Sequence, residues 1–394
     1  MARVTNQGET VLMARRLWIL FGVAAYVAIA LGSSLDRLAV WQPGLAGLVP
    51  APLAAAAHRT RAAEALQKLD QAGALREAQS AVSADPVDLH SAALLGAASL
   101  LSRQPVQADR AFRVAARLGW RDPLTQLHFM NQALRSGETE LAALRLDAVL
   151  RQNPLFPKRD MALSQFGASQ EGRSGLARRL ALRPPWTSQF MGKDSRLPLT
   201  ELRTRAAILT TMQSKRWGCD AIAPLVNRLV EAGDAVTAKR LWSVHCPDAS
   251  PTLADPDFAR MSALRTITPF DWNLVGAGDV TVEPATPNRG GLNANVSGAA
   301  SRKIAWQLLT LSSGTYSLHW IAREPDGTPA RVLSLSLSCD LGKRNPLPTS
   351  LSSDGHFKAE FKVNQNCTNQ YLAVWLSPIS RLVHIESIHI EPQQ

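Results

Sequence analysis

The sequence lacks the local motifs that mark most enzyme families. It contains no Walker loop, no H-E-x-x-H, no G-x-S-x-G and no dinucleotide-binding glycine fingerprint. These absences remove the signatures of P-loop nucleotide hydrolases, zincin metalloproteases, α/β-hydrolases and Rossmann oxidoreductases. The paired carboxylates of a glycoside hydrolase leave no local signature, so a polysaccharide-modifying hydrolase stays open as an alternative. We expect a non-enzymatic protein that uses no cofactor.

Cysteine is scarce, and its spacing excludes the common metal clusters. The chain has four cysteines and no C-x-x-C pair, so we expect no metal site. Cys219 and Cys246 fall in a helical stretch, and Cys339 and Cys367 fall in a β-rich stretch. In an oxidising compartment the simplest pairing is Cys219–Cys246 and Cys339–Cys367, although two other connectivities and four free thiols are alternatives.

Long apolar runs are also few, and the clearest one lies near the start of the chain. Residues 17–35 contain nineteen consecutive residues without a charge, close to the length that crosses the ~30 Å hydrocarbon core. Arg15 and Arg16 precede this run, which predicts a cytoplasmic segment 1–16 and export of the remainder. A cleaved signal peptide ending near Ala30-Leu31-Gly32 is the alternative. Both interpretations export residues 37–394.

Positive charge is concentrated in the first two thirds of the chain. The formal net charge is +11, yet residues 266–394 hold ten basic and ten acidic residues. We expect a basic patch that includes Arg173, Arg178, Arg179, Arg183, Arg203 and Arg205. Such a patch attracts polyanions or anionic lipid head groups, or is a solvated helical surface. Nucleic acid is not an expected partner, because the chain is exported and lacks an aromatic ladder.

Helical patterns begin after an apolar Pro/Gly segment, residues 36–54, which is a linker or lies on the membrane. In residues 93–119, Gly96 and Ala108 are small enough for two helices to approach closely, and Phe112 fills the space beside them. Three units over residues 55–155 end at Pro86, Pro123 and Pro154, which gives periods of 37 and 31 residues.

This spacing resembles the tetratricopeptide repeat, a helix pair of about 34 residues that stacks into a solenoid. The resemblance implies a peptide or protein partner on the concave face. A helical spacer that holds the final domain away from the membrane is the alternative. Residues 156–247 read as further basic helices with a disulfide-capped pair, and residues 248–269 as a linker.

Residues 270–394 alternate with a period of two between Gly, Pro, Asn and Ser clusters, which predicts an antiparallel β-sandwich. The stretches LTLSSGTYSLHW, YLAVWL and IESIHI resemble galactose-binding-type jelly rolls, which are common among carbohydrate-binding modules. The resemblance implies ligand binding, often to sugar. The predicted fold class is therefore a transmembrane helix, an α-helical solenoid and a jelly-roll β-sandwich.

Aromatic side chains are the candidate sugar platform, since the apolar faces of sugar rings stack on exposed indole or phenol rings. The candidates are Tyr371, Trp375, Trp306 and Trp272. In YLAVWL the Leu and Val residues share one face, so Tyr371 and Trp375 point outward if that face is the core. We expect Trp320 in the core. The Glu324-Pro-Asp-Gly turn is a calcium ligand or, more simply, a solvated turn.

Together these features predict a single-pass inner-membrane protein of a Gram-negative bacterium, with its bulk in the periplasm. We expect a scaffold in cell-envelope or exopolysaccharide biogenesis, with a protein partner on the solenoid and a polysaccharide on the jelly roll. In arrangement it resembles the repeat-containing accessory proteins of exopolysaccharide systems. A pure protein-interaction scaffold without sugar binding is the second alternative.

Overall fold

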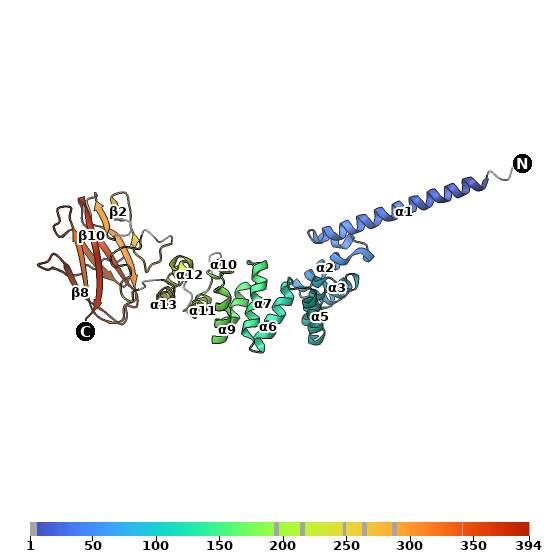
Figure 1. The fold of residues 1–394 in the computed structure, drawn as a ribbon, viewed down its shortest axis with the longest axis horizontal. Helices are drawn as coiled ribbons and strands as arrows, with labels where there is room; N and C mark the ends of the chain where they lie inside the picture. The colour runs from blue at the N-terminus through green and yellow to red at the C-terminus, as the bar shows by residue number, and fades with distance from the viewer. Residues whose placement is uncertain are drawn as a thin grey trace. The chain divides into compact units, whose positions relative to one another are not determined.

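A computed structural model describes residues 6–192, 197–212, 217–246, 250–261, 266–285, 290–340 and 342–393, with side chains from residue 16 onward. The chain forms two compact units, Met1–Pro154 and Leu155–Gln394. The first unit is helical, and the second contains helices followed by two antiparallel sheets (Figure 1). The predicted fold class, helices followed by an antiparallel β-sandwich, is confirmed.

The first helix is the apolar one. Helix α1 spans Asn6–Ala39, and its part Arg16–Ala39 has a mean hydropathy of 1.9 and is long and apolar enough to cross a membrane. Its large apolar side chains, such as Trp18 and Phe21, are exposed. A surface of this kind is stable in hydrocarbon and costly in water.

The segment that follows α1 packs closely on the first helical pair. It forms two 3-10 helices, η1 (Pro43–Leu48) and η2 (Ala51–Leu53). The Asp36 carboxylate accepts hydrogen bonds from the backbone N–H groups of Ala56 and Ala57, at 3.0 and 2.8 Å. These groups belong to the first turn of α2, whose N–H groups have no partner within the helix. The residues expected to form a linker therefore fasten the apolar helix to the helical array.

Three helix pairs follow in the first unit. They are α2 (Ala55–Gln67) with α3 (Gln71–Ala84), α4 (Leu89–Leu101) with α5 (Pro105–Leu118), and α6 (Pro123–Arg135) with α7 (Thr139–Gln152). Asp70, Asp88 and Asp122 cap α3, α4 and α6 by accepting a backbone N–H three residues on. A Cβ added to Gly96 would lie 2.8 Å from the Phe112 ring. Glycine is therefore needed where α4 meets α5.

The repeat has a constant period. The residues with positive φ between the two helices of each pair are Leu69, Arg103 and Gly137, at φ 58°, 58° and 78°. Their positions recur every 34 residues, and so do the buried Ala74, Ala108 and Ala142. The periods of 37 and 31 residues inferred from the prolines are corrected by this finding. Pro86 and Pro154 lie in the connections that follow a pair, whereas Pro123 is the first residue of α6, so the left-handed turn inside each pair is the better marker of the register.

The second unit opens with shorter helices. They are α8 (Arg159–Ser164), η3 (Gln165–Gly167), α9 (Gln170–Leu180), α10 (Thr187–Phe190), α11 (Leu199–Thr210), α12 (Cys219–Glu231) and α13 (Ala235–His245). A disulfide joins Cys219 at the start of α12 to Cys246 just after α13. Asp234 caps α13, and Gly233 before it has φ +85°. This last pair repeats the turn chemistry of the first unit.

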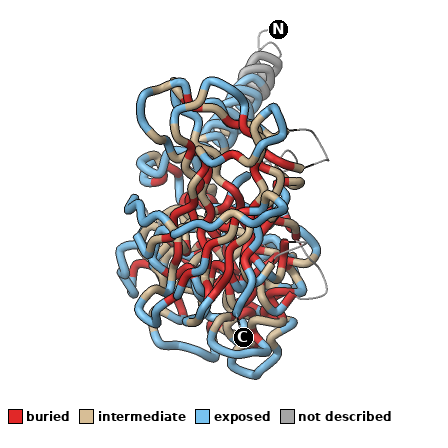
Figure 2. Tube along the Cα trace, turned by 90° about the vertical axis from the view of Figure 1, so that its left-hand side faces the viewer, coloured by how far each residue is buried: buried red, intermediate tan, exposed pale blue. Residues whose placement is uncertain are grey.

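Within the described residues, the sandwich contains ten strands in two sheets. One sheet has the order β1-β4-β9-β6, with β1 (Asn273–Leu274), β4 (Arg302–Leu309), β9 (Gln370–Leu376) and β6 (Leu333–Ser338). The other has the order β2-β3-β10-β5-β8-β7, with β2 (Val280–Pro284), β3 (Leu292–Val296), β10 (Ile379–Pro392), β5 (Gly314–Arg323), β8 (Phe357–Val363) and β7 (Thr349–Leu351). Along the chain trace, buried residues gather in the interior and exposed residues on the outer loops (Figure 2).

The segment 250–261 belongs to the sandwich, although it lies within the expected linker. Leu253 and Phe258 are buried in the sandwich core. The side-chain amide of Gln307 on β4 makes hydrogen bonds with both backbone groups of Ala254, at 2.9 and 3.0 Å. These bonds satisfy a buried amide and tie the segment to the sheet. Residues 247–249 and 262–265, on either side of this segment, lie outside the described residues.

Candidate functional site

Strand β9 divides its side chains between the core and the outer surface. Leu372, Val374 and Leu376 are fully buried between the sheets. Tyr371 and Trp375 are half-buried and lie on the opposite face. The period-two alternation of a strand produces this division, as the sequence indicated. The outer face of the sheet β1-β4-β9-β6 is called the aromatic face below.

The aromatic face holds its three rings in a row. Ala373 lies between Tyr371 and Trp375 on β9, and its partner on β4 is Trp306. The small Ala373 side chain leaves space for the Trp306 indole. The Trp306 and Tyr371 ring centroids are 6.0 Å apart with an interplanar angle of 54°, within the range of favourable aromatic pairs. The sheet register thus brings together three of the four aromatic residues predicted from sequence.

The Trp375 indole is fixed by a hydrogen bond. Its Nε1–H donates to the Ser336 hydroxyl of β6 at 2.8 Å. The Arg344 guanidinium carbon lies 4.6 Å from the Trp375 ring centroid, in a cation–π contact worth about 0.5–1 kcal/mol at an exposed site. One indole face is therefore covered by an exposed, movable side chain, and the ring orientation is set from the neighbouring strand.

A row of hydroxyl groups lies beside the aromatic row, and sequence reasoning missed it. Strand β6 reads LSLSLS, and Ser334, Ser336 and Ser338 pair with Trp375, Ala373 and Tyr371 of β9. The intervening leucines are buried in the core, so the three serines share the outer face. The strict Leu-Ser alternation was the sequence signal for this hydroxyl row. Hydroxyl groups next to aromatic rings suit a ligand with both apolar faces and polar edges.

Tyr371 lies at the end of the row that adjoins a pocket. Burial raises the pKa of its phenol, and the nearby Asp340 carboxylate raises it further. The phenol therefore stays protonated over the physiological range and serves as a hydrogen-bond donor or acceptor. Ser338, the β6 partner of Tyr371, also lines the pocket.

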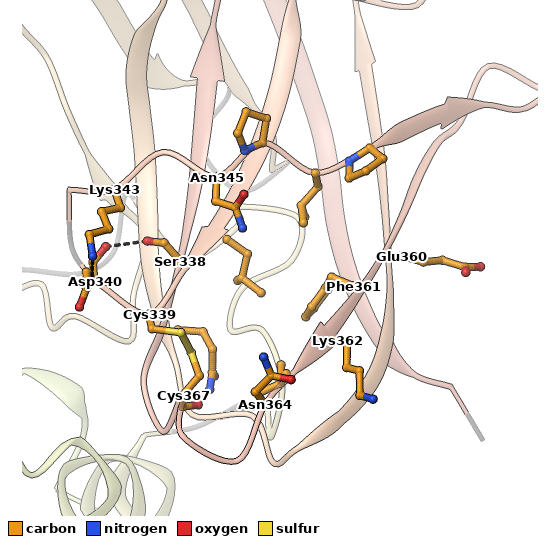
Figure 3. A pocket seen from close by; sticks show the side chains of 16 residues that line it. Ser338, Cys339, Asp340, Lys343, Asn345, Glu360, Phe361, Lys362, Asn364 and Cys367 are labelled. Carbon is orange, nitrogen blue, oxygen red and sulfur yellow. Dashed lines mark hydrogen bonds and ion pairs between the residues drawn. A yellow bond between two sulfur atoms is a disulfide. The ribbon is translucent and has the colours of Figure 1, made fainter.

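This pocket lies beside the Cys339–Cys367 disulfide and has a volume of about 670 Å³; we call it the disulfide pocket. Phe361, Asn345 and Asn364 point toward the cavity, whereas Glu360 points away from it (Figure 3). Lys343 pairs with Asp340 at 2.5 Å, and Lys358 pairs with Glu360 at 3.0 Å. The hydrogen bond from Lys358 lowers the pKa of Glu360. The two carboxylates that line the pocket are thus both ion-paired.

Trp272 does not belong to the platform, which corrects the expectation for this residue. It is only 2% exposed, and its indole Nε1–H donates to the backbone oxygen of Asp255 at 3.0 Å. Its ring packs on Phe258 with a centroid distance of 5.0 Å. The segment 250–261 covers it, and this contact could not be inferred from the local pattern around residue 272. Trp320 is buried, in agreement with its expected place in the core.

The predicted basic patch is also corrected at one position. Arg205 is fully buried, and its guanidinium donates to the backbone oxygens of Gln189 and Phe190 and to the Asp160 carboxylate, at 3.0, 2.6 and 2.6 Å. Its role is to join α11 to α8 and α10. Arg203 is exposed and pairs with Asp234 at 2.5 Å. The other four arginines of the set lie on or after α9, with Arg178 and Arg183 exposed and Arg173 and Arg179 half-buried.

The turn at Glu324 is organised by its own hydrogen bonds. Asp326 accepts from the backbone N–H and hydroxyl of Thr328, at 3.0 and 2.6 Å, and these bonds lower the pKa of Asp326. Gly327 has φ +83°. Within the described ranges, no group of three or more His, Cys, Asp or Glu side chains gathers at a spacing suited to a metal ion.

Two solved structures are similar to this chain over its C-terminal β region. No family model matches the chain, and no curated protein matches it. The tetratricopeptide resemblance therefore has no support from a family model. A solved structure from Bacteroides thetaiotaomicron VPI-5482, to which sugar binding has been attributed, is 13% identical over 32% of this chain and 90% of its own, with a TM-score of 0.24. TmCBM61 in complex with β-1,4-galactotriose is 14% identical over 31% of this chain and 88% of its own, with a TM-score of 0.22.

Proposed function

We propose that the aromatic face binds a saccharide, with Trp375 as its central contact. The observation that carries the proposal is the hydrogen bond that fixes the Trp375 indole on the outer surface of the sheet. A sugar ring presents an apolar face of C–H groups, which gains dispersion and hydrophobic contact on a flat aromatic ring. A ring whose orientation is fixed before binding loses little conformational entropy on binding.

The length of the aromatic row favours an oligosaccharide over a single sugar. Tyr371 and Trp375 are four residues apart on one strand, which corresponds to roughly 13 Å at ~3.3 Å per residue. Trp306 lies between them on the neighbouring strand and contacts Tyr371. The Ser334 and Ser338 hydroxyls flank the row and are suited to hydrogen bonds with sugar hydroxyls.

Arg344 competes with the saccharide in this proposal. A guanidinium 4.6 Å from the indole centroid occupies the position that a sugar ring would take on that face. The side chain is exposed, and it donates a long hydrogen bond of 3.4 Å to the Ser334 hydroxyl. Binding therefore requires Arg344 to move aside, at a cost of about 0.5–1 kcal/mol.

The described carboxylates near the site favour binding over hydrolysis. A glycosidase general acid needs a raised pKa, so that it is protonated near neutral pH. Glu360 has a lowered pKa because Lys358 donates to it, and Asp340 is paired with Lys343. The hydrolase alternative is thus the weaker one for this site.

The test compares Trp375→Ala with a matched tryptophan variant elsewhere. The full chain, in detergent, is titrated with a panel of neutral oligosaccharides by calorimetry and affinity electrophoresis. The control is Trp120→Ala, since Trp120 is half exposed and lies in the first unit. The proposal expects binding by the wild type and the control, and at least tenfold weaker binding by Trp375→Ala. Absence of binding by the wild type across the panel contradicts the proposal.

A membrane-anchored protein in the cell envelope is the setting that we propose for this activity. Support comes from the apolar helix α1 and from two disulfides, which persist in oxidising compartments. The test is a reporter enzyme fused to the carboxyl end, of a kind that is active in the periplasm and inactive in the cytoplasm. We expect this fusion to be active. A role in exopolysaccharide biogenesis is the further proposal, and loss of polymer in a deletion strain is its test.

We further propose that the helix pairs form a tetratricopeptide-type array that binds a protein. The constant period of 34 residues supports the assignment. An exposed aromatic residue supports the binding role: Trp120 is 50% exposed, and the Arg145 guanidinium lies 3.9 Å from its ring centroid. Tryptophan and arginine are enriched in protein interfaces. Cross-linking from position 120 in membranes should capture a protein partner that Trp120→Ala fails to retain.

A further inference from the structure

A second cavity of the unit Leu155–Gln394 lies between helix α13 and two loops of the sandwich. Its volume is about 480 Å³, and it is lined by residues 310–313, by residues of the 364–368 loop, and by Val236, Lys239 and Arg240 of α13. We call it the junction pocket. The loop residues of this lining include Ser312, Ser313 and Thr368, which carry hydroxyls, and Asn364 and Gln365, which carry amides. Its lining combines two cations with uncharged polar groups, and no carboxylate lines it among the described residues.

Lys239 is the unusual member of this lining. It is 9% exposed, and its ammonium lies 4.3 Å from the Trp242 ring centroid and 5.2 Å from that of Phe270. In the part of the chain that the structure describes, Asp271 and Arg260 act on this ammonium through charge alone, without a hydrogen bond. A buried ammonium in apolar surroundings is costly, and its neighbouring aromatic faces compensate only in part.

The acidic group that acts on Lys239 is already engaged by other partners. Asp271 is the acidic group that acts on it and Arg260 the basic one. Arg260 and Thr268 already use the Asp271 carboxylate, at 3.4 and 2.6 Å. Arg240 adds another cation on the same helix at the rim of the pocket. Among the described residues, the lining of the junction pocket itself therefore holds two cations and no carboxylate, and a bound anion would balance them.

We propose that the junction pocket binds the carboxylate of an acidic sugar. The carboxylate pairs with Lys239 and Arg240, and the sugar hydroxyls pair with Ser312, Ser313 and Asn364. Carboxylate and ammonium form charge-assisted hydrogen bonds, which are the stronger ones in a partly buried site. The inference does not rest on saccharide binding at the aromatic face, because it uses different residues on different elements.

The protonation of Lys239 gives the site a defined pH dependence. Burial lowers the pKa of Lys239 to about 8; Asp271 opposes this shift and Arg260 adds to it. Carboxylate binding needs the charged ammonium, so the affinity falls as the pH rises through about 8. A bound carboxylate favours the charged form and raises the pKa of Lys239 in the complex. At pH 7 most of the protein is in the binding-competent form.

The test uses a matched pair of ligands that differ in one charge per ring. The full chain, in detergent, is titrated by calorimetry with α-1,4-trigalacturonate and with its methyl ester at pH 7 and at pH 9. The site predicts at least tenfold tighter binding of the acid at pH 7 and a loss of that preference at pH 9. Lys239→Met should abolish the preference, whereas Lys239→Arg should retain it. Lys158→Met, at an exposed lysine in the same unit, is the control that leaves it unchanged.

The outcomes separate this inference from the aromatic-face proposal. In Trp375→Ala the preference for the acid should persist even when affinity for neutral oligosaccharides is lost. Equal affinity for acid and ester in the wild type overturns the inference, and so does an acid preference that Lys239→Met retains. If Lys239→Met fails to fold, titrations of the wild type and of Lys239→Arg at pH 7 and pH 9 decide the question. The wild type should lose its preference for the acid at pH 9, whereas Lys239→Arg should keep it, because arginine stays charged at both pH values.

Discussion

Two sets of tryptophans in the sandwich occupy opposite environments. Trp320 and Trp272 are buried between the sheets or beneath the 250–261 segment, while Trp306 and Trp375 are half-buried on the aromatic face. Trp320 stacks on Phe357 with a centroid distance of 5.5 Å, and Trp375 is covered by the movable Arg344. The same residue type thus contributes to stability inside the sandwich and is available for a ligand outside it. The face of the strand on which a tryptophan lies, together with the segment or side chain that covers that face, decides between the two roles.

The largest expected effect is on the inside of the sandwich. Trp320→Ala should lower the free energy of unfolding by about 3–5 kcal/mol, because it removes a large buried side chain and leaves a cavity. Thermal unfolding followed by near-ultraviolet circular dichroism measures this loss. A decrease of less than about 1 kcal/mol in the free energy of unfolding would contradict the contrast between buried and outer tryptophans, because it would mean that the core tolerates the loss of the Trp320 ring.

The buried ammonium gives the next largest effect, and it depends on pH. The pKa of Lys239 is about 8 in the folded chain and near its ordinary value in the unfolded chain. Between these values the unfolded chain binds more protons, so the free energy of unfolding should rise with pH from about 8 to about 10, by on the order of 3 kcal/mol. Urea titrations at several pH values measure the slope. Lys239→Met should remove it, and an unchanged slope in this variant contradicts the assignment.

Trp375→Ala should separate binding from stability on the outer face. Affinity for a neutral oligosaccharide should fall at least tenfold, or about 1.4 kcal/mol. The free energy of unfolding should fall by only about 1 kcal/mol, the usual contribution of one hydrogen bond such as that to Ser336. A loss of several kcal/mol in stability would instead place Trp375 with the core residues.

The smallest effect has an informative sign. Arg344→Ala should raise the affinity for a neutral oligosaccharide about two- to fivefold, because it removes a side chain that covers the indole face at a worth of ~0.5–1 kcal/mol. Arg331→Ala, at another exposed arginine of the sandwich, serves as the control. A lower affinity in Arg344→Ala would mean that the guanidinium is a ligand contact and not a cover.

Local pattern predicted the alternation on β9, since Tyr371 and Trp375 follow directly from the buried Leu372, Val374 and Leu376. It also indicated the two pairs of bonded cysteines. It could not place Trp272, which is covered by a segment that reads as a linker and is held to β4 by hydrogen bonds between Ala254 and Gln307. Long-range packing of this kind leaves no periodic signal in the segment itself.

Two further residues show the same limit. Arg205 lies among basic residues in the sequence, yet it is buried. Oxygens of α8 and α10 accept the hydrogen bonds of its guanidinium. The prolines suggested unequal repeats, whereas the positive φ at Leu69, Arg103 and Gly137 sets a constant period. The amino-acid sequence does not show which non-glycine residue will adopt a positive φ. Where the deciding contact is local, as in LSLSLS, the sequence contained the signal.

The most direct test of the account is the indole resonance of Trp375. Tryptophan Nε1–H groups are observed by ¹H–¹⁵N spectroscopy of the full chain in detergent and assigned through Trp375→Phe and Trp120→Phe. On addition of the oligosaccharide that binds best, the Trp375 resonance should shift in proportion to occupancy, and the Trp120 resonance should stay in place. Saturating binding that leaves the Trp375 resonance unmoved would contradict the account.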